Sequence, residues 1–190
     1  MDITIFGKGN MGTAIGKNFE AAGNQVAYYT SKDHVDSFGD LVILAVPYPA
    51  LASIADEYGD SLKGKVVVDI TNPLDFNTFD SLVVPADSSA AQELQAKLPD
   101  SKVLKAFNTN FAATLESGSV DGVTKTTVMV AGDDDDAKQS FKSALADSQL
   151  AVIDAGKLKR ARELEAFGFL QMTTAASKQI NWTGGFGVIK

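Results

Sequence analysis

The chain opens with Met1-Asp2-Ile3-Thr4-Ile5-Phe6-Gly7-Lys8-Gly9-Asn10-Met11-Gly12, the stretch that decides its fold. A β-branched and aromatic run leads into three glycines, and a helical pattern follows them directly. Strand, glycine turn and helix in this order are the context of the dinucleotide-binding fingerprint. Gly7 permits the tight turn, Gly9 lets a pyrophosphate approach the backbone, and Gly12 allows close packing of helix on strand. The start of the helix offers free N–H groups to phosphates. The predicted nucleotide site comprises Gly7, Lys8, Gly9, Asn10, Met11 and Gly12.

The end of the second predicted strand indicates which dinucleotide binds. The run 25–29 is typical of a strand, and Thr30, Ser31 and Lys32 follow it. NAD-binding chains usually carry an acidic residue here for the ribose 2′-hydroxyl. Two hydroxyls and a cation suit the 2′-phosphate of NADP instead. A shift of a few residues would make Asp33 the acidic ribose ligand, but we predict NADP, bound by Thr30, Ser31 and Lys32.

Composition limits the classes of protein and of partner. The 190 residues are 45% hydrophobic, which predicts a single domain with a core large enough to fold alone. The absence of cysteine excludes disulfides and thiolate chemistry. A net charge of −7 argues against nucleic acid or an anionic membrane as partner. The chain begins on its first strand and lacks an apolar run of about 20 residues, so we expect a cytoplasmic protein.

Strands and helices alternate along the rest of the sequence. Apolar runs predict strands at 41–46, 65–70, 102–107, 126–131 and 149–154. Helices are expected at 50–58, from Ser89 with Gln92 at capping-box spacing, from the acidic run 133–136, and at 159–178. The pattern predicts an α/β fold, a single Rossmann-type doubly wound domain over residues 1–190 with a mostly parallel sheet. Only eight residues, 32–39, follow the second strand, so its usual crossover helix should be reduced and the adenine rim open.

Further motifs occur in order along nearly the whole chain. They are Gly7-x-Gly9-Asn10-Met11-Gly12, Ala45-Val46-Pro47, Asp69-Ile70-Thr71-Asn72-Pro73-Leu74, Ser89-Ala90-Ala91, Leu98-Pro99, Lys105-Ala106-Phe107-Asn108-Thr109, Ala131-Gly132-Asp133-Asp134, and Asp154-Ala155-Gly156 with Leu158, Ala161-Arg162 and Leu164-Glu165. With these motifs the sequence resembles the family of NADP oxidoreductases that reduce a deazaflavin, coenzyme F-420. The shortened segment 32–39 is the departure from the family pattern.

The resemblance implies that the nicotinamide half of NADP lies along the loops that follow the strands. The carboxyl ends of parallel strands line the ligand crevice of such a sheet. Amide and hydroxyl side chains there can bond ribose or carboxamide, and the prolines fix the loops. The implied residues are Ala45, Val46, Pro47, Thr71, Asn72, Pro73, Ala106, Phe107, Asn108 and Thr109.

The sequence offers few groups for acid–base catalysis. The single histidine, His34, falls beside the expected adenosine phosphate and reads as an exposed loop residue or a phosphate contact. Lys105 lies within a strand, where an ion pair is a better interpretation than a general acid. The acids at 133–136 suit a helix start better than a metal site. We therefore predict no catalytic side chain and no metal, which fits hydride transfer between two ring systems because the cofactor supplies that chemistry.

These observations predict an NADP-dependent oxidoreductase whose acceptor is a deazaflavin, with flavin, quinone or a ferric chelate as rivals. A reductase of the pyrroline-carboxylate type and a non-catalytic NADP sensor are the alternatives. The run 158–172 has helical spacing suited to a core or to the face of a homodimer. The tail 181–187 carries two aromatic residues among glycines, and would fold over the acceptor pocket or pack on a second subunit.

Overall fold

Short runs rich in Val, Ile and Leu form the centre of the molecule. In the computed structural model, which describes residues 1–189, seven strands of that range make one sheet in the order β2-β1-β3-β4-β5-β8-β9. The first five pair in parallel, which explains their continuous apolar runs, since helices cover both faces of such a sheet. These strands are β1 (Asp2–Phe6), β2 (Gln25–Tyr29), β3 (Leu41–Leu44), β4 (Val66–Asp69) and β5 (Lys102–Lys105).

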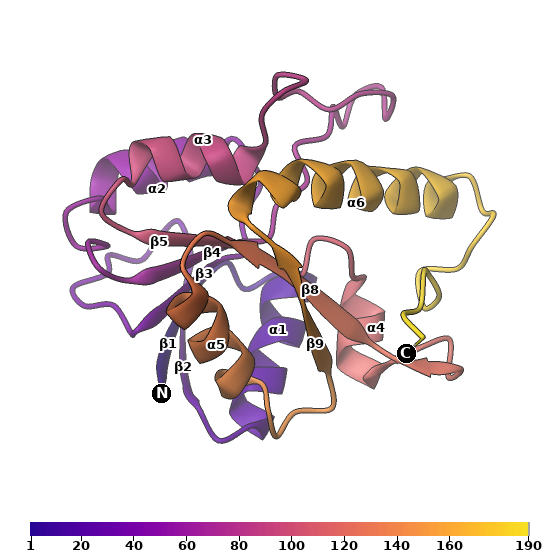
Figure 1. Ribbon diagram of the computed structural model, residues 1–190, viewed down its shortest axis with the longest axis horizontal. Helices are drawn as coiled ribbons and strands as arrows, with labels where there is room; N and C mark the ends of the chain where they lie inside the picture. Colours follow the sequence, from indigo (N-terminus) through magenta and orange to yellow (C-terminus); the bar gives the residue numbers. More distant parts are fainter. Residues whose placement is uncertain (190) are drawn as a thin grey trace.

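The helices form one layer on each face of the sheet (Figure 1). Alternate residues of β3 show the division, because Leu41 and Ile43 pack with one layer while Val42 and Leu44 pack with the other. The first layer holds α1 (Asn10–Ala21), α4 (Ala112–Ser117) and α5 (Asp135–Ala144). The second holds α2 (Ala50–Tyr58), α3 (Ala90–Lys97), the 3₁₀ turn η1 (Leu158–Arg160) and the start of α6 (Ala161–Ala176).

The far edge of the sheet runs in the opposite direction. β8 (Thr127–Gly132) pairs antiparallel with β5, and β9 (Ala151–Gly156) pairs parallel with β8. The short helix α4 and the hairpin of β6 (Ser119–Val120) and β7 (Thr124–Lys125) reverse the chain between β5 and β8. The prediction of a mostly parallel Rossmann-type sheet is confirmed, whereas the hairpin was not predicted.

The predicted capping and loop features also occur. The Ser89 hydroxyl oxygen accepts a hydrogen bond from the Gln92 backbone at 3.2 Å and caps α3. Asp134 caps α5 in the same way, accepting from Ala137 at 2.8 Å. Within the described chain, the link from β2 to β3 contains neither helix nor strand, as its length predicted. No helix among residues 1–189 is long and apolar enough to cross a membrane.

Gly7 offers a direct test of the turn that follows β1. Its φ of +101° is strained for other residues, and an added Cβ would overlap the carbonyl oxygen of Ala45. We expect Gly7→Ala to lower the free energy of unfolding by about 2 kcal/mol or more, measured by urea denaturation. Gly9→Ala is the matched control, because Gly9 has a φ of −77° and its Cβ would meet no atom of residues 1–189 within 4 Å. Equal losses for the two variants would contradict this account of the turn.

Candidate functional site

The main cavity lies where the carboxyl ends of the central strands meet the start of α1. Its volume is about 780 Å³, within the usual range for small-molecule sites. It opens at the switch point of the sheet, where β1 lies between β2 and β3 and the chain leaves in opposite directions. Lining residues come from the glycine turn, the loops after β3, β4 and β5, the start of α4, and the far half of α6 with the tail beyond it.

The glycine turn has the features of a phosphate-binding loop. Gly7 and Gly12 must be glycines for the fold itself, since an added Cβ at Gly12 would overlap the carbonyl oxygen of Gly7. Gly9 faces open space, so the fold leaves room for a ligand against its backbone. It is also the N-cap of α1 and supplies no side-chain cap, which leaves the first N–H groups of that helix for a bound anion.

A reciprocal amide pair joins the loops after β4 and β5. The Asn72 amide donates to the backbone oxygen of Asn108 at 2.8 Å, and the Asn108 amide donates to Asn72 Oδ1 at 2.8 Å. Asn108 also donates to the backbone oxygen of Leu164 on α6 at 2.8 Å. Helix α6 approaches the pair closely at Gly168, where a Cβ would lie 2.6 Å from Asn72 Oδ1. The two loops and α6 are therefore held as one unit.

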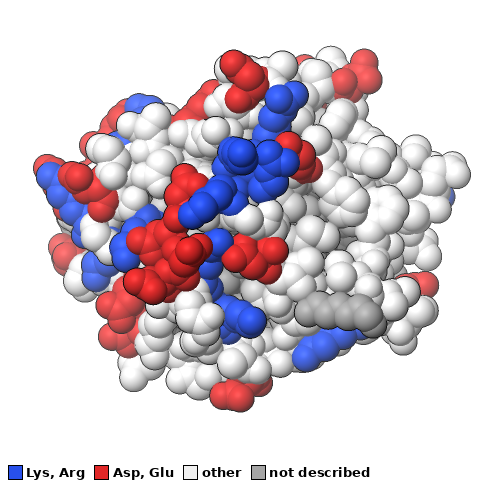
Figure 2. Space-filling model, viewed as in Figure 1, with Lys and Arg blue, Asp and Glu red and all other residues white. Residues whose placement is uncertain are grey.

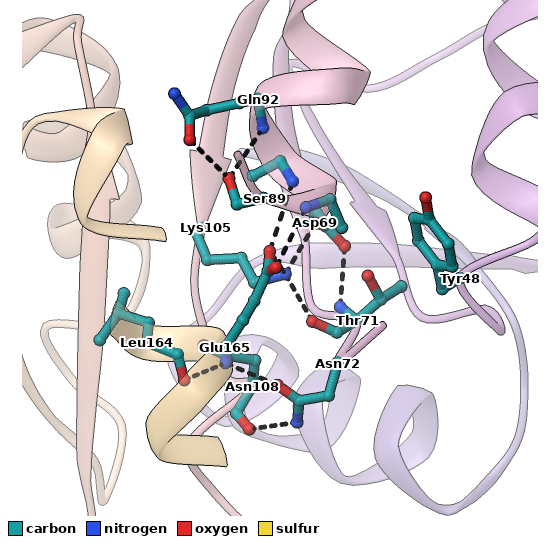
Figure 3. A network of polar contacts seen from close by, with 12 residues as sticks. Tyr48, Asp69, Thr71, Asn72, Ser89, Gln92, Lys105, Asn108, Leu164 and Glu165 are labelled. Atoms are coloured by element: carbon teal, nitrogen blue, oxygen red, sulfur yellow. Dashed lines mark hydrogen bonds and ion pairs between the residues drawn. The ribbon is translucent and has the colours of Figure 1, made fainter. Parts of the chain in front are cut away.

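Behind these loops lies a fully buried ion cluster (Figure 3). The Lys105 ammonium lies 2.8 Å from Asp69 Oδ2 and 2.8 Å from Glu165 Oε1, and it also donates to the backbone oxygen of Thr71. Glu165 Oε2 accepts from the backbone N–H of Ala90 at 3.0 Å, at the start of α3. Burial raises the pKa of the Glu165 carboxyl, and the nearby Lys105 charge opposes that rise. The prediction that Lys105 forms an ion pair is confirmed.

Several buried oxygens at the cavity lack a hydrogen-bond partner within the described chain: Thr71 Oγ1, Asn108 Oδ1 and Asn110 Oδ1. Buried polar atoms are paired in the great majority of cases, so these oxygens are available to bond a ligand or ordered water at the cavity. Together with the open face of Gly9 and the free start of α1, these oxygens fit a bound dinucleotide. The residues present thus match the cofactor that the sequence predicted.

The end of β2 differs in detail from its prediction. Asp33 accepts hydrogen bonds from both the backbone N–H of Thr30 at 2.8 Å and the Thr30 hydroxyl at 2.7 Å. These bonds, the hydroxyl's first, lower the pKa of the Asp33 carboxyl. The Thr30 hydroxyl proton is therefore engaged, and Ser31 and Lys32 remain exposed beside the turn. Lys8 lies next to them, with its ammonium 5.5 Å from the centre of the Tyr28 ring.

The outer end of the cavity is aromatic and apolar. Phe111 and Trp182 pack with ring centres 4.8 Å apart, and Phe76 and Met172 complete this end. Trp182 belongs to the tail beyond α6, which folds back onto the molecule rather than extending away. In Figure 2 the side that carries the far half of α6 and the tail shows few charged side chains, and the charges gather on the opposite side. Residues 166–177 contain no Lys, Arg, Asp or Glu.

Gln171 connects the tail to the loop after β5. This buried amide donates to the backbone oxygen of Thr109 at 3.1 Å and accepts from the backbone N–H of Phe186 at 3.3 Å. The tail is also held by the backbone N–H of Asp121, which donates to the oxygen of Thr183 at 2.9 Å. In the described chain the tail folds back so that Trp182 lines the cavity, and packing of the tail on a second subunit stays a prediction.

The structure brings most predicted residues to the cavity, but not all. Ala106 and Phe107 are buried in the core and do not line the cavity, so their assignment as cofactor contacts stays a prediction. Phe107 has a φ of +62°, which turns its ring away from the cavity toward Phe19 and Phe141. Predicted residues that line the cavity are Gly9, Asn10, Met11, Gly12, Ala45, Val46, Pro47, Thr71, Asn72 and Asn108. Those outside its lining are Gly7, Lys8, Thr30, Ser31, Lys32, Pro73 and Thr109.

Other lining residues were missed by sequence reasoning. Tyr48 follows the predicted Ala45–Pro47 segment, and its hydroxyl donates to Glu93 at 2.6 Å. Burial, followed by this hydrogen bond, raises the pKa of Tyr48 to about 12. Asn110 continues the polar run after β5 and could have been predicted from that run. The apolar residues of the lining could not, because their sequence pattern is that of ordinary core residues. The missed residues are Tyr48, Ile70, Phe76, Asn110, Phe111, Ala112, Ala113 and Met172.

Fold and site together define a Rossmann-type dinucleotide-binding protein. Residues 27–73 match the family model described as NADP oxidoreductase coenzyme F420-dependent. The chain is 36% identical over 132 residues to the F420-dependent NADP reductase of Methanocaldococcus jannaschii, covering 67% of this chain and 58% of that protein. The resemblance to the deazaflavin-dependent NADP oxidoreductase family is therefore confirmed.

Two further comparisons are with a second curated relative and with a solved structure. The chain is 31% identical over 144 residues to the metalloreductase STEAP3 of Rattus norvegicus, covering 74% of this chain and 27% of that protein. The chain thus spans less than two thirds of the length of either curated relative. A crystal structure of a putative F420-dependent NADP reductase from Arthrobacter sp. FB24 superimposes with a TM-score of 0.85 at 23% identity, covering 100% of both chains. This likeness confirms the fold.

Gly9→Val tests the glycine turn as a binding site. The branched side chain would fill the open face where a pyrophosphate must approach, while the fold has room for it. We expect loss of NADPH binding by titration calorimetry with an unchanged circular dichroism spectrum. Ala21→Val, at the exposed last residue of α1, controls for the added branched side chain. Retained affinity in Gly9→Val would contradict the assignment of the turn.

Proposed function

We propose that this chain is an NADP-dependent oxidoreductase that transfers a hydride between NADP(H) and a planar acceptor of the deazaflavin class. One observation carries the proposal: a single cavity runs from the glycine turn past the strand ends to Phe111 and Trp182. Such a cavity can hold a dinucleotide at one end and a second ring system at the other. The resemblance to proteins named F420-dependent NADP reductases supports both halves of the assignment.

We assign the parts of NADP(H) to the residues that suit them chemically. The backbone of residues 7–12 would hold the pyrophosphate at the start of α1. Ser31 and Lys32, with Lys8 nearby, would meet the 2′-phosphate, and Thr30, whose hydroxyl donates to Asp33, would shape their turn. Residues 45–47 and the pair Asn72 and Asn108 would meet the nicotinamide half, with Pro73 and Thr109 shaping their loops.

The protein's own contribution is alignment of two rings and exclusion of water. Bound NADP(H) supplies the transferable hydride. The residues that line the cavity, taken from the described part of the chain, include no Lys, Arg, Asp, Glu or His. His34 does not line the cavity, and its side chain is 74% exposed. The Tyr48 hydroxyl, which does line it, already donates to Glu93. The site therefore favours hydride transfer between rings over reduction of an imine or ketone, which needs a proton donor.

Transient kinetics with a panel of acceptors tests the proposal. Enzyme saturated with NADPH is mixed with deazaflavin, flavin, quinone or ferric chelate, and loss of NADPH absorbance is followed. We expect the fastest transfer to the deazaflavin, and His34→Ala should remain within a few-fold of the parent. A drop of 10²- to 10⁴-fold in His34→Ala would indicate acid–base catalysis. Tight NADPH binding without turnover on any acceptor would favour the alternative of a non-catalytic NADP sensor.

Assembly as a homodimer and a cytoplasmic location stay predictions.

Lys32→Ala tests recognition of the 2′-phosphate. Loss of one charged hydrogen-bond partner costs about 1.5–3 kcal/mol, or about 10- to 100-fold in affinity. We expect Lys32→Ala to weaken NADPH by that factor and to leave NADH nearly unchanged. Lys63→Ala is the matched control, because Lys63 is exposed and pairs with Asp60 before β4, at the opposite end of the strand from the cavity. Equal losses for NADPH and NADH would show that Lys32 does not bind this phosphate.

A further inference from the structure

We propose that Lys105 and Glu165 are positioning residues for the nicotinamide half of NADP(H), and that they act through the backbone of Thr71. The inference rests on the proposed function and deepens it. Neither side chain reaches the cavity, since both are fully buried behind its wall. Thr71 does line the cavity, and its backbone is where the buried cluster and the cavity meet.

The cluster fixes the backbone of Thr71 from both sides. Its N–H donates to Asp69 Oδ1 at 2.7 Å, and its carbonyl oxygen accepts from the Lys105 ammonium. Lys105 has three N–H donors, and Asp69, Glu165 and Thr71 accept one each. Figure 3 shows the ammonium between the two carboxylates with the Thr71 carbonyl directed at it. With both groups bonded, the backbone of Thr71 is fixed at the wall of the cavity, and with it the position of the Thr71 Cβ.

Helix α6 and helix α3 hold the cluster in turn. Glu165 lies on α6 and accepts from Ala90 at 3.0 Å and from Ala91 at 3.4 Å, the first two N–H groups of α3. The positive end of the α3 dipole balances the second buried carboxylate. Glu165 is thereby fixed by α6, on which it lies, and by the start of α3, which it bonds. It can therefore hold the Lys105 ammonium in one position.

Stability alone does not account for such a cluster. Apolar side chains of similar volume often replace a buried ion pair without loss of stability, because removing charges from water is costly. The charged cluster instead constrains the positions of particular atoms, because ion pairs and hydrogen bonds are directional and apolar contacts are not. The residue that gains a fixed place here is Thr71, which lines the cavity and whose Oγ1 is buried and has no partner among the described residues. We assign this oxygen to a polar group of the nicotinamide half.

Lys105→Met separates this role from a merely structural one. Two ligands are compared by calorimetry: NADPH, and adenosine 2′,5′-bisphosphate, which lacks the nicotinamide half. We expect NADPH to bind about 10-fold more weakly and hydride transfer to slow by about 10²-fold, since small displacements in a site have losses of that order. Affinity for adenosine 2′,5′-bisphosphate should be unchanged. Lys138→Met is the matched control, because Lys138 is also buried and ion-paired, with Asp154 at 2.7 Å, on the far edge of the sheet.

Thr71→Val provides a second variant that keeps the cluster intact. It replaces an unpaired hydroxyl with a methyl group of similar size, so the fold should keep its stability. We expect weaker NADPH binding and unchanged affinity for adenosine 2′,5′-bisphosphate, as in Lys105→Met. Should Lys105→Met fail to fold, Thr71→Val and Glu165→Gln carry the test with the same two ligands.

The outcomes distinguish this inference from the proposed function. Equal weakening of both ligands in Lys105→Met, or equal behaviour of Lys105→Met and Lys138→Met, would overturn the positioning role while NADPH still binds the parent protein. An unchanged NADPH affinity in Thr71→Val would also overturn it. Failure of the parent protein to bind NADPH would instead refute the proposed function itself.

Discussion

The buried contact of Lys105 with Asp69 and Glu165 is the constraint on which the rest of the site depends. It joins the ends of β4 and β5 to α6, and through Ala90 it joins α3 as well. A lysine without exposed surface must have its charge balanced and its donors satisfied. These requirements fix where α6 can pack, and therefore where the wall of the cavity stands.

Three kinds of interaction build the site. Close backbone approach shapes the cofactor end, where Gly7 and Gly12 bring β1, α1 and the Ala45 segment together. Directed polar contacts shape the middle, where Asn72 and Asn108 pair with each other and with α6. Apolar rings shape the outer end. The cavity therefore combines backbone N–H groups, neutral amides and aromatic rings in one lining.

The sequence predicted what depends on neighbours along the chain. The turn at residues 7–12, the Ser89 cap and the short link after β2 are local patterns with local causes. The strand-end loops were also predicted, because the carboxyl ends of parallel strands meet at one edge. The positive φ of Phe107 was invisible, since a run such as Lys105-Ala106-Phe107 looks like continuous strand.

Contacts between distant segments could not be predicted from one sequence. A lysine and an aspartate within apolar strands indicated buried charge, but nothing assigned Glu165 as their partner. The antiparallel pairing of β8 with β5 was not predicted, because the β6–β7 hairpin that helps to reverse the chain has strands too short to recognise in the sequence. The bonds from Thr30 to Asp33 were not predicted either, although the two residues are close in sequence. The conformation of the turn decides that the Thr30 hydroxyl donates to Asp33.

The folded tail has a consequence for the order in which the molecule is completed. Gly9 and Trp182 line the same cavity although nearly the whole sequence lies between them. Translation makes the glycine turn well before Trp182, and every strand of the sheet precedes the tail along the chain. The wall of the cavity is thus complete only when the tail has emerged and Gln171 has bonded the backbone of Phe186. A nascent chain can hold its sheet together well before it has a finished pocket to fill.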